Sequence, residues 1–454
     1  MEGDPAHRLR ARRRRVLVQR RNGRQQLDRD RQVLLPAALR DQEGLPQPAS
    51  PEARRLLRDG LSVVSIRPLD LSVGGGARRS EFVTRRVGVV WRAFDLQLVT
   101  YAALLVCFGL AMAYSNSATA AVGLFETGSV FLRGLMWAVL AMIAFLLVSA
   151  FDYHWLKTFA WPLYLLQLGL LALTLGIGSG VGGTSRWVSI AGQQVQFSEI
   201  AKVLMIVVLA NYLGSRAGRM GSLWSIVGAG ILAGPPFLLV LLQPDLGTAL
   251  VLGAILAGML FMSGASLRWL GASAAAAVAA LPFIWTYVLQ DYQKARLTAF
   301  LDPLSDLQGA GYQLYQSQIA VGSGGLFGRG LTNGSQNAAG LLPVDTTDFV
   351  FAILAEELGF IGAVVVIGLF VLLLWRILVA GWRSKDPFGT MFACGLATWI
   401  LFQLVVNVGM VIGVMPITGI PLPFVSHGGS SLISIAIGLG IIESINVRQG
   451  RAEW

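Results

Sequence analysis

Residues 349–380 read FVFAILAEELGFIGAVVVIGLFVLLLWRILVA, an apolar run interrupted by few charges. The run is longer than the roughly 20 residues that an α-helix needs to cross about 30 Å of hydrocarbon, so it predicts a membrane-spanning helix. Carboxylates surround its beginning: Asp345 and Asp348 precede it, and Glu356 and Glu357 lie inside it. Ionisable side chains are costly at membrane depth, which makes these acids functional candidates.

Comparable apolar runs fill most of the chain. Its 454 residues are 54% hydrophobic and 13% charged, with a mean hydropathy of +0.62, which is too apolar for a soluble domain and too long for one membrane anchor. We therefore predict an all-α polytopic membrane protein with ten transmembrane helices, at residues 96–115, 131–150, 159–178, 197–213, 224–243, 247–265, 268–289, 349–380, 388–412 and 425–445. Cys107 and Cys394 are far apart in apolar runs and indicate neither a disulfide nor a thiolate metal site.

The N-terminal 92 residues differ from the rest. They hold 21 of the 36 Lys and Arg and 10 of the 25 Asp and Glu, so all of the net charge of +11 belongs to them. This Arg-rich, aperiodic segment predicts a disordered cytoplasmic tail; binding to anionic lipid headgroups and translation upstream of the true start are the alternatives. No short basic segment leads into an apolar core and cleavage site, so a signal peptide is not expected. A membrane domain over residues 93–447 and a short cytoplasmic tail over 448–454 complete the predicted organisation.

Basic residues in the loops predict the orientation. With the tail inside, the inner loops and C-terminus hold more of them than the outer loops, so both termini are expected in the cytoplasm. The inner set is Lys157, Arg216, Arg219, Arg268, Arg376, Arg383, Lys385, Arg448 and Arg451, and the outer set is Arg186, Lys294, Arg296 and Arg329.

One large extracytoplasmic loop, residues 290–348, separates the seventh and eighth predicted helices. A loop of this length is usually functional. Residues 312–321 predict a short amphipathic helix, and the following GSGGLFGRG, residues 322–330, is either a plain turn or a backbone site for an anion.

Other charged residues lie near the predicted helix ends. Glu199 and Lys202 share one helical face, either as a structural ion pair or in contact with substrate. Arg186, beside Trp187, is either an interfacial anchor or a phosphate-binding group. Asp245 lies in a short Pro-Asp turn, where it either caps the next helix or lines a site at the membrane surface.

The chain lacks the Walker, dinucleotide-binding, HExxH and Cys/His motifs, which argues against nucleotide-driven and zinc chemistry. Carboxylates at the outer face suit a general base that takes a proton from a sugar hydroxyl. Nucleotide-activated donors are absent outside the cell, so such a donor would arrive on a lipid diphosphate, faced by the basic residues of the outer set.

Four ordered blocks carry a family resemblance: QPDLGTALV (243–251), YQSQIAVGSGGLFGRG (315–330), LLPVDTTDFVFAILAEELGFIGA (341–363) and GMVIGVMPITGIPLPFVSHGGSSL (409–432). Together they resemble the SEDS family (shape, elongation, division and sporulation), over residues 95–446. The cell-elongation branch is the most similar, and the division branch is the alternative.

The resemblance implies a ten-helix peptidoglycan glycosyltransferase of the bacterial inner membrane. It would polymerise lipid II into glycan strands at the outer face and release undecaprenyl diphosphate. Expected partners are a class B penicillin-binding protein, other elongation-complex membrane proteins and membrane lipids, with no nucleic acid. No metal site is predicted, although a divalent cation such as Mg²⁺ at the diphosphate stays open.

The family's catalytic aspartate corresponds to Asp348 and its conserved Glu and Lys to Glu199 and Lys202. Three family residues differ: Thr346 replaces a His, Phe197 a Pro and His427 a Tyr. The remaining expected binding or supporting residues are Arg186, Asp245, Arg296, Gln316, Ser317, Ser323, Gly324, Gly325, Thr347, Glu356, Ser426, Gly428, Gly429 and Ser430.

The four acids of the opening stretch receive different expected roles. Asp348 is the base at the first turn of a helix, where the N-terminal N–H groups favour its ionised form, and Asp345 is a solvated turn residue. Glu356 and Glu357, about 12 to 14 Å deeper along one continuous helix, are expected in a buried polar network. A lipid flippase or transporter and a non-catalytic scaffold for the transpeptidase are the other function classes.

Overall fold

The structure is a computed structural model that describes residues 94–119, 126, 129–178, 186–190, 193–218, 220–302, 309–338 and 348–449. The predicted disordered tail, Thr346, Thr347 and Asp345 lie outside the described residues.

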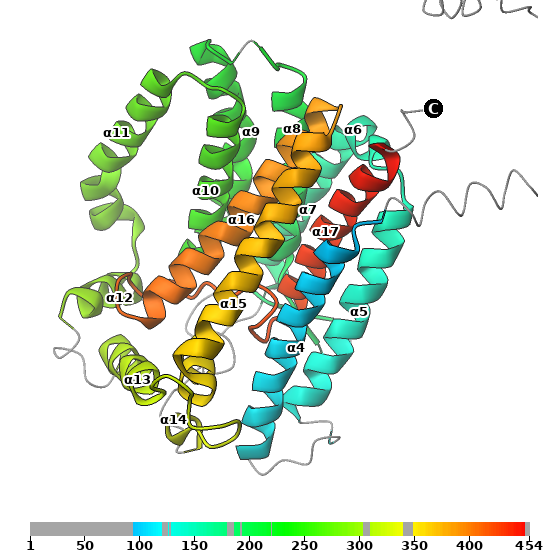
Figure 1. Cartoon of the computed structure of the whole chain (residues 1–454). Coiled ribbons are helices and arrows are strands. Elements are labelled where there is room, and N and C mark those ends of the chain that lie inside the picture. The colour runs from blue at the N-terminus through cyan, green and yellow to red at the C-terminus, as the bar shows by residue number, and fades with distance from the viewer. Residues whose placement is uncertain are drawn as a thin grey trace, which may run out of the picture. The chain divides into compact units, whose positions relative to one another are not determined.

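The described part of the chain is a bundle of long antiparallel helices (Figure 1). In chain order these are α4 (Leu96–Thr119), α5 (Val130–Ala150), α6 (His154–Thr158), α7 (Ala160–Ile177), α8 (Phe197–Gly214), α9 (Leu223–Leu242), α10 (Leu246–Met262), α11 (Leu267–Phe283, continued by a π-helix, Ile284–Val288), α15 (Val350–Arg383), α16 (Pro387–Val411) and α17 (Gly429–Gln449). A two-stranded antiparallel hairpin, β1 (Val188–Ile190) and β2 (Gln193–Val195), separates α7 from α8 and adds strands to the predicted all-α architecture.

The helices agree closely with the predicted spans. Within the described residues, nine helices are long and apolar enough to cross a membrane. The sixth predicted span corresponds to α10, whose 17 apolar residues are shorter than those of the nine. A polytopic helical membrane protein is therefore confirmed, whereas the number ten stays a prediction.

Burial is uneven across the bundle. The helices α8, α16 and α17 form its centre: about 67%, 72% and 78% of the residues in their membrane-spanning stretches are buried. In contrast, α11 has no buried residue and stands apart from its neighbours in Figure 1. Apart from Arg268 in its first turn and Ser273, its exposed side chains are apolar, as expected for a helix that faces lipid on most sides.

The segment between α11 and α15 folds into three short helices, α12 (Asp291–Leu301), α13 (Ala310–Ser323) and α14 (Ser335–Ala338). They lie at the end of the bundle where α15 begins (Figure 1). The amphipathic helix predicted at residues 312–321 is confirmed by α13.

The helix predicted over residues 349–380 is not continuous, which corrects our expectation. Its backbone leaves helical geometry at Gly359 (φ 69°, ψ −169°), so that α15 consists of two helices. The Gly-rich loop packs against this break: the amides of Arg329 and Gly330 donate to the carbonyls of Glu356 and Glu357, at 3.0 Å each. On the far side of the break, the amides of Phe360 and Ile361 donate to the carbonyls of Gly325 and Leu326. The loop thus replaces hydrogen bonds that the broken helix lacks.

This joint predicts a sharp difference between two glycines. Gly328 has φ +79°, and a Cβ there would collide with the Glu357 carbonyl oxygen, whereas Gly322 has open space. We expect Gly328→Ala to lower the free energy of unfolding by roughly 1–3 kcal/mol and Gly322→Ala to leave it nearly unchanged. Thermal unfolding of the detergent-purified variants measures both, and equal melting temperatures would contradict the described joint.

Candidate active site

The candidate site centres on Gly419, in the turn between α16 and α17. A Cβ placed on Gly419 would lie 3.3 Å from Nη1 of Arg296 and 3.6 Å from Oδ2 of Asp348. Arg296 lies in α12, and Asp348 lies two residues before the start of α15. The two charged side chains therefore border the same point. Gly419 has φ +70°, a conformation that favours glycine and leaves this point unfilled.

Asn407 fixes the backbone around this point. Its Nδ2 donates to the carbonyl oxygens of Asp348 at 2.9 Å and of Ile420 at 2.8 Å. The Asn407 side chain is fully buried in α16, and its bond to Ile420 is shielded from water. The amide thereby holds Asp348 and the Gly419 turn together. Sequence analysis missed this residue, although an amide inside an apolar helix was an available signal.

A second polar group lies at the start of α10. Asp245 accepts from the amide of Thr248 at 3.1 Å and from its hydroxyl at 2.8 Å, which confirms the capping alternative. It also accepts from Nε2 of Gln196 at 2.9 Å and lies 3.6 Å from Nη1 of Arg186. The carboxylate is thus used to organise the turn and to position Arg186.

This group is connected to the Gly419 turn. A Cβ on Gly247 would lie only 2.7 Å from the carbonyl oxygen of Thr418, so α10 begins directly against that turn. From the other side, the Tyr292 hydroxyl donates to the Pro244 carbonyl at 2.7 Å and ties α12 to the same place. Asp245 and Arg186 therefore flank the Asp348 site.

Glu356 has a different environment. The carboxylate is fully buried and accepts from the amide and the hydroxyl of Ser335, at 2.8 and 2.9 Å, and from Ser323 at 3.4 Å. Arg329 approaches it at 3.8 Å. Glu357 accepts a hydrogen bond from Ser115 in α4. Both acids therefore belong to a buried polar network that holds loops and helices together, as expected from the sequence. They lie in the short first part of α15, before the break, and not along one continuous helix.

The Gly-rich loop is built mainly for packing. Gly324 lies against the Ala355 carbonyl, where a Cβ would not fit, and the Gly328 amide donates to the Gly324 carbonyl at 2.8 Å. The amides of Arg329 and Gly330 already donate to α15. Gly325, with φ +56°, makes the turn itself. These contacts favour the plain-turn alternative over an anion-binding loop.

Glu199 and Lys202 form a buried ion pair inside the bundle, with 2.5 Å between Nζ and Oε1. The ammonium also lies 5.0 Å from the centre of the Trp399 ring, where the ring face attracts a cation. The pair joins α8 to α16 and does not share the Gly419 point with Asp348. The geometry favours the structural alternative.

The other expected residues have mostly structural partners. Ser317 donates to the Val411 carbonyl at 3.0 Å and joins α13 to the end of α16, while Gln316 is half-buried on α13. The Ser426 hydroxyl accepts from the Leu422 amide, and Ser430 accepts from the Gln196 amide at 3.0 Å. Gly428 donates to the Ser426 carbonyl, and Gly429 leaves no room for a Cβ beside Trp137.

Among the described residues no three His, Cys, Asp or Glu side chains come close enough to hold a metal ion.

His427 packs on α5. Its Nε2 lies 2.6 Å from the Val130 carbonyl oxygen, which requires the Nε2–H tautomer if the ring is neutral. Burial lowers the pKa of His427, and nearby Arg133 lowers it further, against a raising effect of the bond to Val130. The imidazole is therefore neutral at pH 7.

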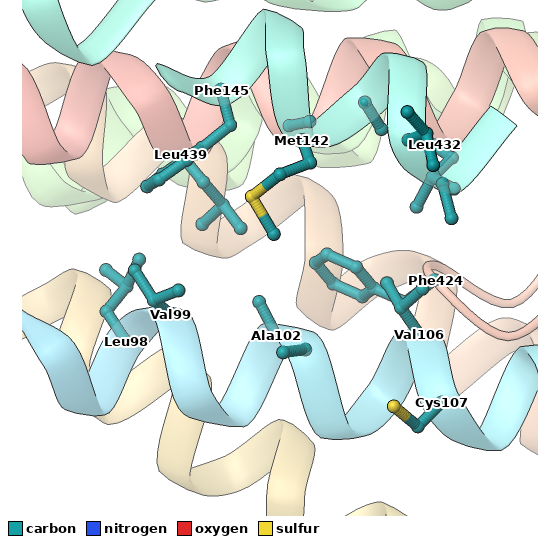
Figure 2. A pocket seen from close by; sticks show the side chains of 15 residues that line it. Leu98, Val99, Ala102, Val106, Cys107, Met142, Phe145, Phe424, Leu432 and Leu439 are labelled. Atoms are coloured by element: carbon teal, nitrogen blue, oxygen red, sulfur yellow. The ribbon is translucent and has the colours of Figure 1, made fainter. Parts of the chain in front are cut away.

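An apolar cavity of about 350 Å³ lies next to the His427 loop. Figure 2 shows the side chains of α4, such as Val99 and Ala102, facing Met142 and Phe145 of α5 across it, with Phe424 at one end. None of the described residues that line the cavity is charged. Its wall suits a hydrocarbon chain.

Residues 95–450 match the family model described as Cell cycle protein, FtsW/RodA/SpoVE. The chain belongs to the FtsW/RodA/SpoVE family. This family is the SEDS family of the sequence analysis, so that expectation is confirmed.

Relatives in the FtsW/RodA/SpoVE family include a probable peptidoglycan glycosyltransferase FtsW from Trichlorobacter lovleyi, 37% identical over 78% of this chain and 93% of the relative. The peptidoglycan glycosyltransferase MrdB of Escherichia coli is 40% identical over 63% of this chain and 77% of the relative. The relatives' names agree with the expected enzyme class.

Solved structures of the FtsW/RodA/SpoVE family show the same fold. One comes from a study of how a peptidoglycan synthase complex coordinates polymerization and crosslinking; it is 31% identical, covers 78% of this chain and 98% of its own, and has a TM-score of 0.67. Thermus thermophilus RodA is 29% identical with a TM-score of 0.59, over 78% of this chain and 97% of its own.

The Asn407 clamp can be tested against a matched position. Asn407→Leu removes both donors and leaves two buried carbonyl groups unpaired, so we expect a loss of about 2–4 kcal/mol in unfolding free energy. Gln403 lies one turn earlier, is 1% exposed, and its amide has no partner among the described residues, so Gln403→Leu should be neutral or stabilising. Thermal unfolding compares the two, and similar losses would count against the clamp.

His427 predicts a pH dependence of stability. An unfolded histidine titrates at a pKa of about 6.5. Because the pKa is lower in the folded protein, the stability that neutral His427 contributes is present above pH 6.5 and is lost as the pH falls below it. We expect the melting temperature to fall from pH 7 to pH 5 in the native protein, and to fall less in His427→Tyr. Parallel curves would disprove this contribution.

Proposed function

We propose that the chain polymerises lipid II, with Asp348 as the general base. One observation carries the assignment: Asp348 and Arg296 border the same open point at Gly419. A carboxylate that takes a proton beside a guanidinium that attracts phosphate is the arrangement that glycosyl transfer from a lipid diphosphate needs.

In the proposed reaction, Asp348 removes the proton from the C4 hydroxyl of the acceptor lipid II. The oxygen attacks the anomeric carbon at the reducing end of the growing strand and forms the new glycosidic bond. The bond from that carbon to the diphosphate breaks, and undecaprenyl diphosphate leaves with the electron pair. Arg296 balances the charge of the diphosphate, and Arg186, directed by Asp245, lies on the same side.

The wider setting follows from the same proposal. The chain crosses the bacterial inner membrane ten times, with both termini in the cytoplasm and Asp348 at the outer face. It works with a class B penicillin-binding protein, which the similar structure from a complex that coordinates polymerization and crosslinking supports. The apolar cavity between α4 and α5 suits the polyprenyl chain of the substrate. A Mg²⁺ ion bound to the diphosphate is part of the proposal, with no protein residue assigned to hold it.

The role in elongation is proposed over a role in division. The blocks at residues 319–330 and 409–426 resemble the elongation branch. Relatives named FtsW and MrdB are both similar to this chain at 37% and 40% identity. Rescue of rod shape or of septation in cells that lack one of the two native proteins distinguishes the branches.

The decisive measurement is polymerisation of labelled lipid II by the purified protein together with its transpeptidase. We expect Asp348→Asn to lower the rate by roughly 10²–10⁴-fold, the usual contribution of a general base. Asp291→Asn is the control, because this acid of α12 is fully exposed and should keep the native rate. Undiminished product from Asp348→Asn would overturn the assignment. If that variant also moved lipid II across vesicles as the native protein does, a flippase would be favoured.

A further inference from the structure

A second cavity lies at the opposite end of the bundle from Asp348. It has a volume of about 440 Å³ and is formed by the beginning of α7, the end of α8 and the first turns of α9. The adjoining Gly214 packs against the start of α16, which follows the end of α15. The cavity is therefore separated from the candidate active site by the length of the helices.

The lining of this cavity has two parts. Buried Val208, half-buried Leu232 and exposed Ile231 provide an apolar wall, and Asn211, Ser215 and Arg216 lie toward the end of α8. Trp161, 64% exposed, stands at the rim. Indole rings with this exposure are typical of the membrane–water boundary, so the cavity spans the boundary with its polar part outward.

The side chain of Arg216 is held in a fixed position beside the cavity. Its guanidinium lies 3.9 Å from the centre of the Tyr212 ring, which holds the side chain in place. Tyr212 in turn donates to the Ser225 carbonyl at 3.2 Å, and its hydroxyl occupies space that any side chain at Gly228 would fill. The position of Arg216 therefore depends on the packing of α8 against α9.

Arg216 also differs from its neighbours in charge pairing. At the same end of the bundle, Lys157, Arg376 and Arg448 each pair with a carboxylate, at 2.9, 2.6 and 3.3 Å. Among the described residues Arg216 has no acidic partner within salt-bridge distance. A positive charge beside a cavity with an apolar depth is complementary to an anion that carries a hydrocarbon chain.

We infer that this cavity binds one anionic phospholipid of the membrane leaflet on that side. Arg216 and Asn211 bind the phosphodiester, and one acyl chain lies along Val208, Ile231 and Leu232. The volume is within the range of small-molecule sites in proteins. The inference does not depend on the glycosyltransferase assignment, because no residue is shared between the two sites.

Native mass spectrometry of the full chain, released from bilayers of phosphatidylcholine with one-fifth phosphatidylglycerol, tests the inference. We expect a retained phosphatidylglycerol on the native protein, and an about fivefold smaller lipid-bound fraction in Arg216→Gln. Lys385→Gln is the matched control, since Lys385 is an exposed cation at the same end and should retain the lipid. Ile231→Trp, which fills the cavity without changing charge, should lose it.

Three results would overturn the inference: equal retention in Arg216→Gln and the native protein, equal losses in Arg216→Gln and Lys385→Gln, or no preference for phosphatidylglycerol over phosphatidylcholine. A competition arm with inorganic phosphate separates a lipid from a free anion. Displacement of the retained lipid by millimolar phosphate would assign the site to free phosphate, whereas unchanged retention supports the phospholipid.

Discussion

Within hydrocarbon, a polypeptide has to satisfy every backbone hydrogen bond from its own groups. Regular helices meet this constraint without help, and most of the described chain is helical. The chain leaves helical geometry at the break at Gly359 and in the turn around Gly419. At both, another part of the chain supplies the missing partners, through the Gly-rich loop in one case and Asn407 in the other.

The same constraint separates the polar side chains into two groups. Asp245, Glu356 and the Glu199–Lys202 pair are all buried, and each is engaged by neighbours that fix helices or turns. Asp348 and Arg296 instead border a point that Gly419 leaves unfilled. The buried groups hold the helices and turns in place, and Asp348 and Arg296 are the groups that the proposed function assigns to the substrate.

The sequence predicted the helices well because length and hydrophobicity alone decide which segments span a membrane. The start of α15 and the helical character of residues 312–321 were also predictable from local pattern. The break at Gly359 was not, since the apolar run continues past it without a proline and the loop that supplies its hydrogen-bond partners lies about 30 residues earlier in the chain. Asn407 and Gly419 were missed for the same reason: their roles arise only from residues distant in sequence.

The joint at Gly359 divides α15 into a short first part and a longer remainder. The first two turns of α15, with Asp348 ahead of them, are attached through Glu356 to Ser335 and through main-chain bonds to the Gly-rich loop. The longer remainder of α15 is bonded to the same loop through the amides of Phe360 and Ile361, and Arg376 bonds to Asp95 at its far end. Because one loop is bonded to both sides of the break, the direction in which the first two turns leave the membrane-embedded part of α15, and with it the place of Asp348, is set by a segment about 30 residues earlier in the chain.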